Sequence, residues 1–192
     1  MRKAYYVRLS QVKDEQAYSL LLNCRHCTHD QLREYISENR VKSYMKAKLI
    51  EKISTQQGTV YRLTEKGYRE FDKSIIHDHY RYHSNSVEHD IALADKYIQT
   101  MRDEPYCRWR NEEDLKHDRK EQIEDLREQG RYEDALRLAC SSVPDCVITT
   151  TSGVSYGFDI VTDNYTAADI QEKIDYCEEM QICLKRTGVC DS

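Results

Sequence analysis

The hydrophobic and polar positions in the first part of the chain follow the period of amphipathic helices. Residues 14–23 and 28–36 each place their apolar side chains on one face, and the second stretch opens with a Thr-x-x-Gln capping pair. A third helix is predicted over residues 37–50, where one face is apolar and the opposite face is polar and cationic. The apolar face of this third helix consists of Val41, Tyr44, Met45 and Leu49.

The pattern then changes to two short β-prone stretches, residues 51–54 and 59–63, on either side of a Gln-Gln-Gly turn. A further helix starts near Thr64. Three helices, a hairpin and a closing helix predict a winged helix-turn-helix over residues 14–76. We place it in an N-terminal DNA-binding domain of residues 1–80.

The C-terminal domain is predicted to span residues 81–192 and to mix helices with strands. A helix over residues 87–101 is followed by a short strand at residues 106–110. Residues 112–138 are nearly all charged or helix-forming, and we expect them to form a protruding, solvated helical insertion. The predicted fold class is therefore α/β, in the broader α+β sense.

Two β-branched stretches, residues 146–151 and 155–161, predict a strand–turn–strand unit. A helix is predicted after them over residues 166–184, with no obvious later strand. Asp145 lies directly ahead of the first strand, and Asp159 lies within the second. The small α/β domain therefore has two acids on neighbouring strands.

Charge is distributed unevenly along the chain. The net charge is −5, yet residues 1–80 hold fifteen Lys and Arg against ten Asp and Glu, and residues 81–192 are strongly acidic. This split favours a polyanion as partner of the first part and a protein partner for the acidic half. No apolar run approaches the length of a membrane span, and the first residues lack the apolar core of a signal peptide. We therefore expect a cytoplasmic protein without a membrane partner.

Cysteines and histidines raise the question of a metal site. Cys24 and Cys27 have metal-type spacing, but no second such pair follows, so we expect reduced, packed thiols. The histidines between His77 and His89 match no familiar ligand set and are better explained by a linker or packed loop. The sequence leaves open whether either group binds a metal.

The polar face of the third helix is the candidate DNA-binding surface. A recognition helix needs side chains that reach base edges, with cations placed to meet phosphates. The candidate residues are Asn39, Arg40, Lys42, Ser43, Lys46, Lys48, Lys52 and Arg62. The alternative is a winged helix that mediates only protein contacts, with its lysines as a solvated face.

The Pro-Asp ahead of one strand and the acid inside the next resemble the core of PD-(D/E)xK nucleases. In such a core two carboxylates hold Mg²⁺, and a lysine two residues after the second acid steadies the attacking water. The resemblance implies Asp145 and Asp159 as metal ligands and catalytic acids. The lysine position holds Val161, so Lys173 on the following helix is the candidate substitute, and Glu113 is a further candidate catalytic acid.

The arrangement as a whole resembles the replication-relaxation family, winged-helix proteins of Gram-positive plasmids and conjugative elements. Besides the winged helix, the resemblance rests on E-H-D-I-A-L-A-D at residues 88–95, W-R-N-E-E-D-L at 109–115, P-D-C-V-I followed by Y-G-F-D-I, and Q-E-K-I-D-Y at 171–176. It implies sequence-specific binding of double-stranded DNA by an accessory or regulatory factor in replication, relaxation or transfer of a mobile genetic element. Because many winged-helix proteins bind palindromic half-sites as dimers, we also expect a homodimer.

Two other classes of function stay open. A metal-dependent DNA endonuclease or nickase would use Asp145 and Asp159 with Mg²⁺, whereas the DNA-binding interpretation needs no cofactor. A protein-binding adaptor or inhibitor would present the acidic half to a basic partner.

Overall fold

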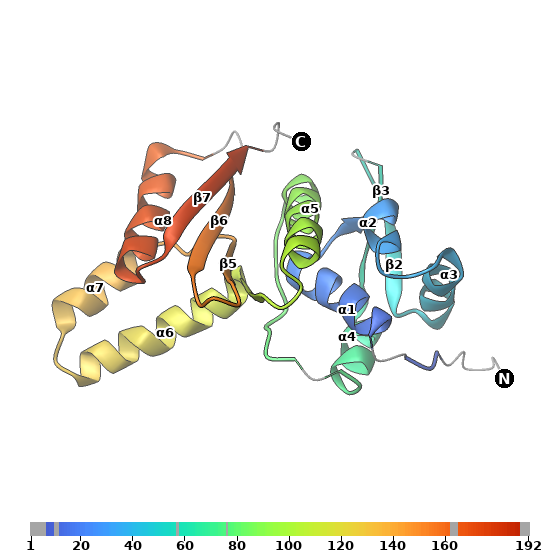
Figure 1. The fold of residues 1–192 in the computed structure, drawn as a ribbon, viewed down its shortest axis with the longest axis horizontal. Helices are drawn as coiled ribbons and strands as arrows, with labels where there is room; N and C mark the ends of the chain where they lie inside the picture. The colour runs from blue at the N-terminus through green and yellow to red at the C-terminus, as the bar shows by residue number, and fades with distance from the viewer. Residues whose placement is uncertain (1–6, 10–11, 57, 76, 162–164, 189–192) are drawn as a thin grey trace. The chain divides into compact units, whose positions relative to one another are not determined.

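The protein contains helices and two separate β-sheets over the residues described by the computed structural model, which are 7–9, 12–56, 58–75, 77–161 and 165–188. This content confirms the α+β class. The chain divides into two compact units, Met1–Gln99 (unit 1) and Thr100–Ser192 (unit 2). Figure 1 shows the elements of both units along the chain.

Unit 1 combines helices with a small antiparallel sheet. Its elements are α1 Lys13–Cys24, β1 Cys27–Thr28, α2 His29–Arg33, α3 Glu38–Ala47, β2 Ile50–Thr55, β3 Gly58–Leu63, α4 Glu65–Asp72 and the first part of α5 Val87–Asp103. The strand order is β1-β3-β2, and the β2–β3 hairpin pairs Ile50 with Leu63 and Thr55 with Gly58. The predicted helices and hairpin are present, and β1 is an additional strand.

Side-chain caps fix where the helices of unit 1 begin. Thr28 and Gln31 form the predicted capping box of α2, Ser37 caps α3 and Thr64 caps α4. α3 ends at Lys48, whose left-handed backbone conformation (φ 58°) turns the chain into β2. Only Lys48 and Leu49 lie between the helix and the hairpin.

The boundary between the units lies later than residue 80, where the sequence predicted it. Residues 81–99 belong to unit 1 as a loop and the first turns of α5. The backbone N–H of Tyr82 donates to the carbonyl of Leu22 at 3.0 Å, and Asp90 Oδ2 lies 2.6 Å from His26 Nδ1. These contacts join residues far apart in the sequence, so no local pattern announces them.

Unit 2 has a four-stranded sheet with helices packed on it. Its elements after α5 are β4 Arg108–Asn111, α6 Glu112–Glu128, α7 Tyr132–Cys140, β5 Cys146–Thr149, β6 Ser155–Val161, α8 Ala167–Glu179 and β7 Cys183–Gly188. The strand order is β4-β5-β6-β7, in which only the β6–β7 pair is parallel. Gly157 lets α8 lie close to the sheet, since a Cβ there would lie 3.0 Å from Cys177 Sγ.

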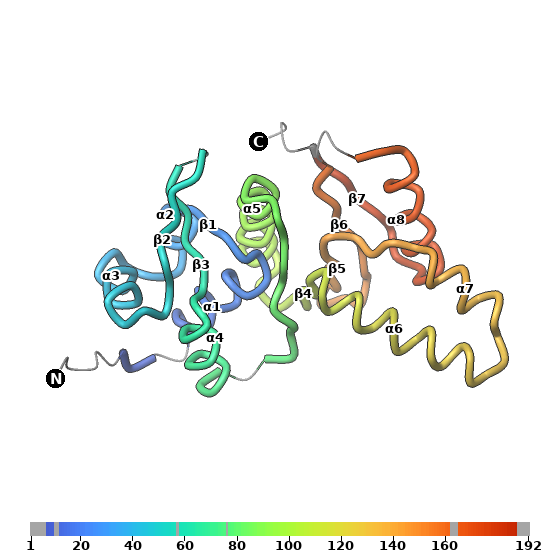
Figure 2. The backbone as a smooth tube through the Cα atoms, turned by 180° about the vertical axis from the view of Figure 1, so that it is seen from behind, coloured from blue at the N-terminus to red at the C-terminus, as the bar shows by residue number. Residues whose placement is uncertain are grey.

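Two features of unit 2 differ from the prediction. α6 and α7 form an antiparallel hairpin (Figure 2), and the apolar side chains on one side of each helix are buried in a shared core instead of being solvated. The core residues of these two helices are Leu115, Leu126, Ala135 and Leu138. The last predicted helix ends at Glu179, and the parallel strand β7 follows it. Among the residues that the structure describes, no helix is both long and apolar enough to cross a membrane.

Candidate functional site

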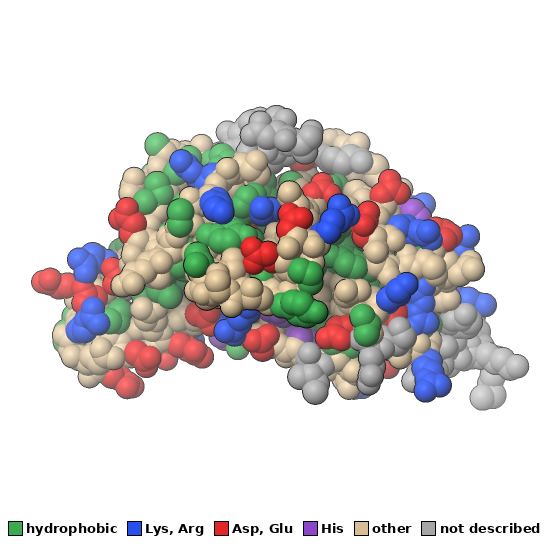
Figure 3. All heavy atoms as spheres, in the orientation of Figure 1, with side chains coloured by type: hydrophobic (Ala, Val, Ile, Leu, Met, Phe, Trp, Pro, Cys, Tyr) green, Lys and Arg blue, Asp and Glu red, His purple; other side chains and the backbone are tan. Residues whose placement is uncertain are grey.

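The exposed face of α3 carries three of the eight candidate DNA-binding residues. Its buried side consists of Val41, Tyr44 and Ala47, and its exposed side includes Asn39, Lys42 and Lys46. Lys48 at the end of α3 and Lys52 on β2 are exposed as well, and Figure 3 shows Lys and Arg side chains on the α3 side of unit 1. Met45, expected on the apolar face, is 37% exposed.

Acidic neighbours reduce the positive charge of this face. Lys42 Nζ lies 3.2 Å from Glu38 Oε1, one turn earlier on α3, and Arg62 Nε lies 2.7 Å from Glu51 Oε1 across the hairpin. Exposed ion pairs of this kind add little stability, because water screens both charges. A phosphate group can therefore replace the carboxylate at little cost.

Arg40 has a different position from the other candidates, in an ion pair with a buried acid. Its Nε donates to Asp14 Oδ1 at 2.9 Å, and its Nη2 contacts the second oxygen of the same carboxylate. The hydroxyl of Tyr44 also donates to Asp14, and burial together with this acid raises the pKa of Tyr44. Because the Arg40 side chain joins α3 to Asp14 of α1, we assign Arg40 a structural role instead of a place on the DNA surface. The Ser43 hydroxyl donates to the backbone carbonyl of Asn39 at 2.8 Å.

Unit 2 contains a buried group of charges that joins three candidate residues. Asp145 directly precedes β5, and Asp159 lies on the neighbouring strand β6, because Cys146 of β5 pairs with Phe158 of β6. Lys173 of α8 reaches both acids: its Nζ contacts Asp159 Oδ1 and lies 3.5 Å from Asp145 Oδ1. The side chains of Asp145, Asp159 and Lys173 are only 5%, 0% and 9% exposed.

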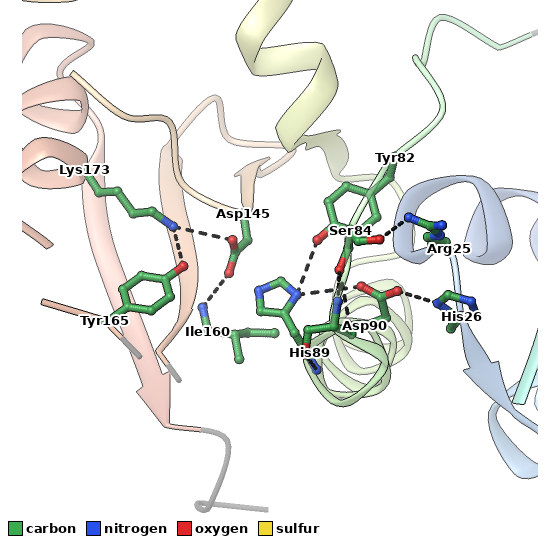
Figure 4. A network of polar contacts seen from close by, with 11 residues as sticks. Arg25, His26, Tyr82, Ser84, His89, Asp90, Asp145, Ile160, Tyr165 and Lys173 are labelled. Atoms are coloured by element: carbon green, nitrogen blue, oxygen red, sulfur yellow. Dashed lines mark hydrogen bonds and ion pairs between the residues drawn. The ribbon is translucent and has the colours of Figure 1, made fainter. Parts of the chain in front are cut away.

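Hydrogen bonds complete this buried group. Tyr165 Oη accepts from Lys173 Nζ at 2.8 Å, and Asp145 Oδ2 accepts from the backbone N–H of Ile160 at 2.7 Å (Figure 4). A buried charge is tolerated only when it is paired and hydrogen-bonded. These partners meet that requirement for the ammonium and for Asp145, whereas Oδ2 of Asp159 is buried without a hydrogen-bond partner among the described residues.

Two carboxyl groups around one ammonium shift each other's titration. Burial raises the pKa of Asp159 to about 6, the nearby carboxyl of Asp145 raises it too, and Lys173 opposes both effects. Burial by itself would lower the pKa of Lys173, but the two acids outweigh it and raise that pKa above its usual value. The lysine therefore stays protonated at neutral pH, while Asp159 titrates near the physiological range.

Glu113 does not belong to this group. Its Oε1 accepts from Lys116 Nζ at 2.8 Å in the first turn of α6. Of the four candidate catalytic residues, the structure brings together Asp145, Asp159 and Lys173. The direction of Lys173 depends on how α8 is rotated against the sheet, which the sequence pattern does not reveal.

The cysteines and histidines considered as metal ligands do not come together in one site. Cys24 and Cys27 are buried and form no disulfide within the described residues, and burial raises the pKa of Cys27. His77 Nε2 lies 3.0 Å from both Tyr18 Oη and Asp72 Oδ1. Within the described parts of the chain, no group of three or more His, Cys, Asp or Glu side chains is placed to hold a metal ion.

A second buried polar group, in unit 1, was missed by the sequence analysis. His26 Nδ1 and Asp90 Oδ2 are 2.6 Å apart and both residues are buried. Asp90 Oδ1 also lies 3.8 Å from His89 Nδ1, which is 3.3 Å from Tyr82 Oη (Figure 4). His89 and Asp90 come from the E-H-D-I-A-L-A-D motif. The contact of Asp90 with His26 therefore gives the motif a role in the packing of α5.

Comparison with known proteins gives no relative for this chain: no protein-family model, curated protein or solved structure matches it.

Proposed function

We propose that unit 1 binds double-stranded DNA, with α3 as the recognition helix and the β2–β3 hairpin as the wing. The observation that carries this proposal is the division of α3 into a buried apolar side and an exposed polar side with lysines. A helix of this kind fits the major groove, and cations at its end and on an adjacent hairpin suit the phosphates that flank it. Asn39, Lys42 and Lys46 are the candidates that enter the groove, where each of the two lysines can contact a base edge or a phosphate at the rim of the groove. Lys48, Lys52 and Arg62 are placed to meet the flanking phosphates.

The proposed role is that of a sequence-specific accessory or regulatory factor of a mobile genetic element, acting as a homodimer in the cytoplasm. The element order of unit 1 supports a winged helix, and the family resemblance of the sequence motifs supplies the mobile-element context. Sequence specificity requires side chains that read bases, and Asn39 and Lys42 are of the types that do so.

Replacing Lys42 and Lys46 together by Ala should weaken duplex binding and flatten its salt dependence. Each lysine that meets a phosphate adds about 0.9 to the slope of log affinity against log salt, so the slope should fall by up to about 1.8. Fluorescence anisotropy with a labelled duplex at several salt concentrations measures both quantities. The matched control is Lys73→Ala with Lys120→Ala, which removes the same charge from exposed positions outside α3 and the hairpin. Equal losses in the two double variants would contradict the recognition-helix assignment.

A metal-dependent nuclease is the second candidate, favoured because Asp145, directly before β5, and Asp159 on β6 meet at one lysine. Carboxylate oxygens are the ligands that Mg²⁺ prefers, so the donor chemistry fits this ion. In this structure the cation between the two acids is the Lys173 ammonium. Mg²⁺ bound there would supply charge stabilisation for phosphodiester cleavage, with Asp145 and Asp159 as its ligands.

If unit 2 is a nuclease, Asp145→Asn should abolish DNA cutting that depends on Mg²⁺ or Mn²⁺. The amide keeps an acceptor for the N–H of Ile160 but loses the negative charge that a metal needs. Gel assays on supercoiled plasmid detect both nicking and cutting, and Asp125→Asn on the exposed side of α6 is the control. An unmodified protein that leaves plasmid intact with either metal would exclude the nuclease, and an absence of duplex affinity at physiological salt would favour the adaptor class.

A further inference from the structure

α7 has an apolar stripe that its own unit does not cover. Ala135 and Leu138 of this helix are buried, whereas Tyr132 and Leu136 are 69% and 66% exposed. These two side chains lie four residues apart and therefore on the same face of the helix, and Cys140 continues that spacing and is exposed too. Burying large apolar side chains stabilises a contact, so a stripe of this kind favours a partner surface.

An acidic groove lies beside this stripe. It has a volume of about 470 Å³ and is lined by Arg137, Leu138, Cys140 and Ser141 from α7 and its end, and by Asp175, Glu178 and Glu179 from α8. Gln171 donates to Asp175 at 2.7 Å. The carboxylates of Glu178 and Glu179 have no hydrogen-bond or ion-pair partner among the residues that the structure describes.

Two arginines accompany these acids: Arg137 is itself part of the groove lining, and Arg131 directly precedes α7. Arg131 and Arg137 both contact Asp134 and are 53% and 69% exposed, so their guanidinium groups are accessible to a partner. One surface thus combines an apolar stripe with cations on α7 and anions on α8. A surface that contains both halves of a charge match is self-complementary, which is what a two-fold interface requires.

We propose that α7 packs antiparallel against α7 of a second copy of this chain in a two-fold symmetric dimer. Leu136 lies near the symmetry axis, Tyr132 covers the end of the opposite helix, and Arg131 and Arg137 of each copy approach the acidic groove of the other. The contact is small for a specific interface, so the dimer dissociates at concentrations on the order of micromolar. This dimer does not depend on DNA binding by unit 1.

Sedimentation velocity of the full chain, from about 1 to about 200 μM, tests the dimer. We expect a shift from monomer to dimer across this range, and Leu136→Glu should weaken the self-association at least about tenfold because it buries a charge at the axis. The matched control is Val154→Glu, which places the same charge at an exposed apolar residue in the turn between β5 and β6. Circular dichroism verifies that both variants are folded.

A second pair of variants tests the charge match. Glu178→Gln with Glu179→Gln should weaken the dimer, whereas Glu121→Gln with Glu124→Gln on exposed positions of α6 should leave it unchanged. An unmodified protein that stays monomeric at the highest concentration would overturn the proposal. A dimer that tolerates Leu136→Glu would overturn it as well, because the contact would then lie elsewhere. If the unmodified protein is monomeric and a co-purifying protein is lost in Leu136→Glu, the stripe belongs to a different partner and the second copy is wrong.

Discussion

Replacing Lys173 by Met should lower the free energy of unfolding of unit 2 by about 3–5 kcal/mol at neutral pH. The ammonium is the cation shared by Asp145 and Asp159, and the side chains of these acids are 5% and 0% exposed. Without it two buried carboxyl groups face each other with no positive partner. Trp109, the single tryptophan of the chain, is buried in β4 of the same sheet, so its fluorescence during urea unfolding measures the loss.

The cost of this substitution should depend on pH in a defined direction. The pKa of Asp159 is raised to about 6 by burial and by Asp145, above the unfolded value near 3.9. An acid whose pKa is higher in the folded state than in the unfolded state contributes stability below its unfolded pKa. That contribution is lost as the pH rises through its folded pKa. Removing Lys173 raises the folded pKa further, so Lys173→Met should cost less at about pH 5 than at about pH 8.

Lys120→Met is the control, since it removes the same charge from an exposed position on α6. It should change the free energy of unfolding by less than about 0.5 kcal/mol at either pH. A Lys173→Met variant as stable as the unmodified protein at the higher pH would mean that water or a conformational change compensates the acids. The buried group would then be no fixed feature of the fold.

The sequence predicted local structure well, because the interactions that specify it are local. The amphipathic spacing of α3 and the capping pair of Thr28 and Gln31 lie within a few residues of each other, and both are present. The two acids of unit 2 were also found, since a turn between two short strands brings Asp145 and Asp159 together through strand pairing. Each of these inferences needed only the spacing of apolar residues along a helix or the pairing of two adjacent strands.

The missed features depend on contacts between distant residues. Arg40 lies on the polar side of the α3 pattern, yet its partner Asp14 is 26 residues away on another helix. His26 and Asp90, which fix α5 to unit 1, are separated by 64 residues. β7 was missed because its sequence, Cys183–Gly188, is polar and its exposed or half-exposed side chains give no strand alternation. Its position is set by pairing with β6 after the turn of α8.

Replacing Gly67 by Ala should destabilise unit 1 by more than about 4 kcal/mol or prevent it from folding. A Cβ at this position would lie 1.8 Å from the carbonyl oxygen of Leu49 and 2.6 Å from its carbonyl carbon. Both are backbone atoms, so no side-chain rotation relieves the overlap. The backbone N–H of Thr64 donates to the same carbonyl at 3.0 Å, which holds the first turn of α4 in place.

This close approach also determines how α3 is held. The Thr64 hydroxyl donates to the carbonyl of Lys48 at 2.6 Å, and Lys66 Nζ donates to that of Ala47 at 2.7 Å, so the start of α4 caps the end of α3. Thermal unfolding followed by circular dichroism compares Gly67→Ala with Glu70→Ala, an exposed position on the same helix that should change stability by less than about 0.5 kcal/mol. If Gly67→Ala melts like the unmodified protein, α4 can move away from Leu49. The orientation of α3 would then have to come from Asp14 and Arg40 instead of α4. A folded Gly67→Ala variant that has lost duplex affinity would show that the capping contact aligns α3 for DNA.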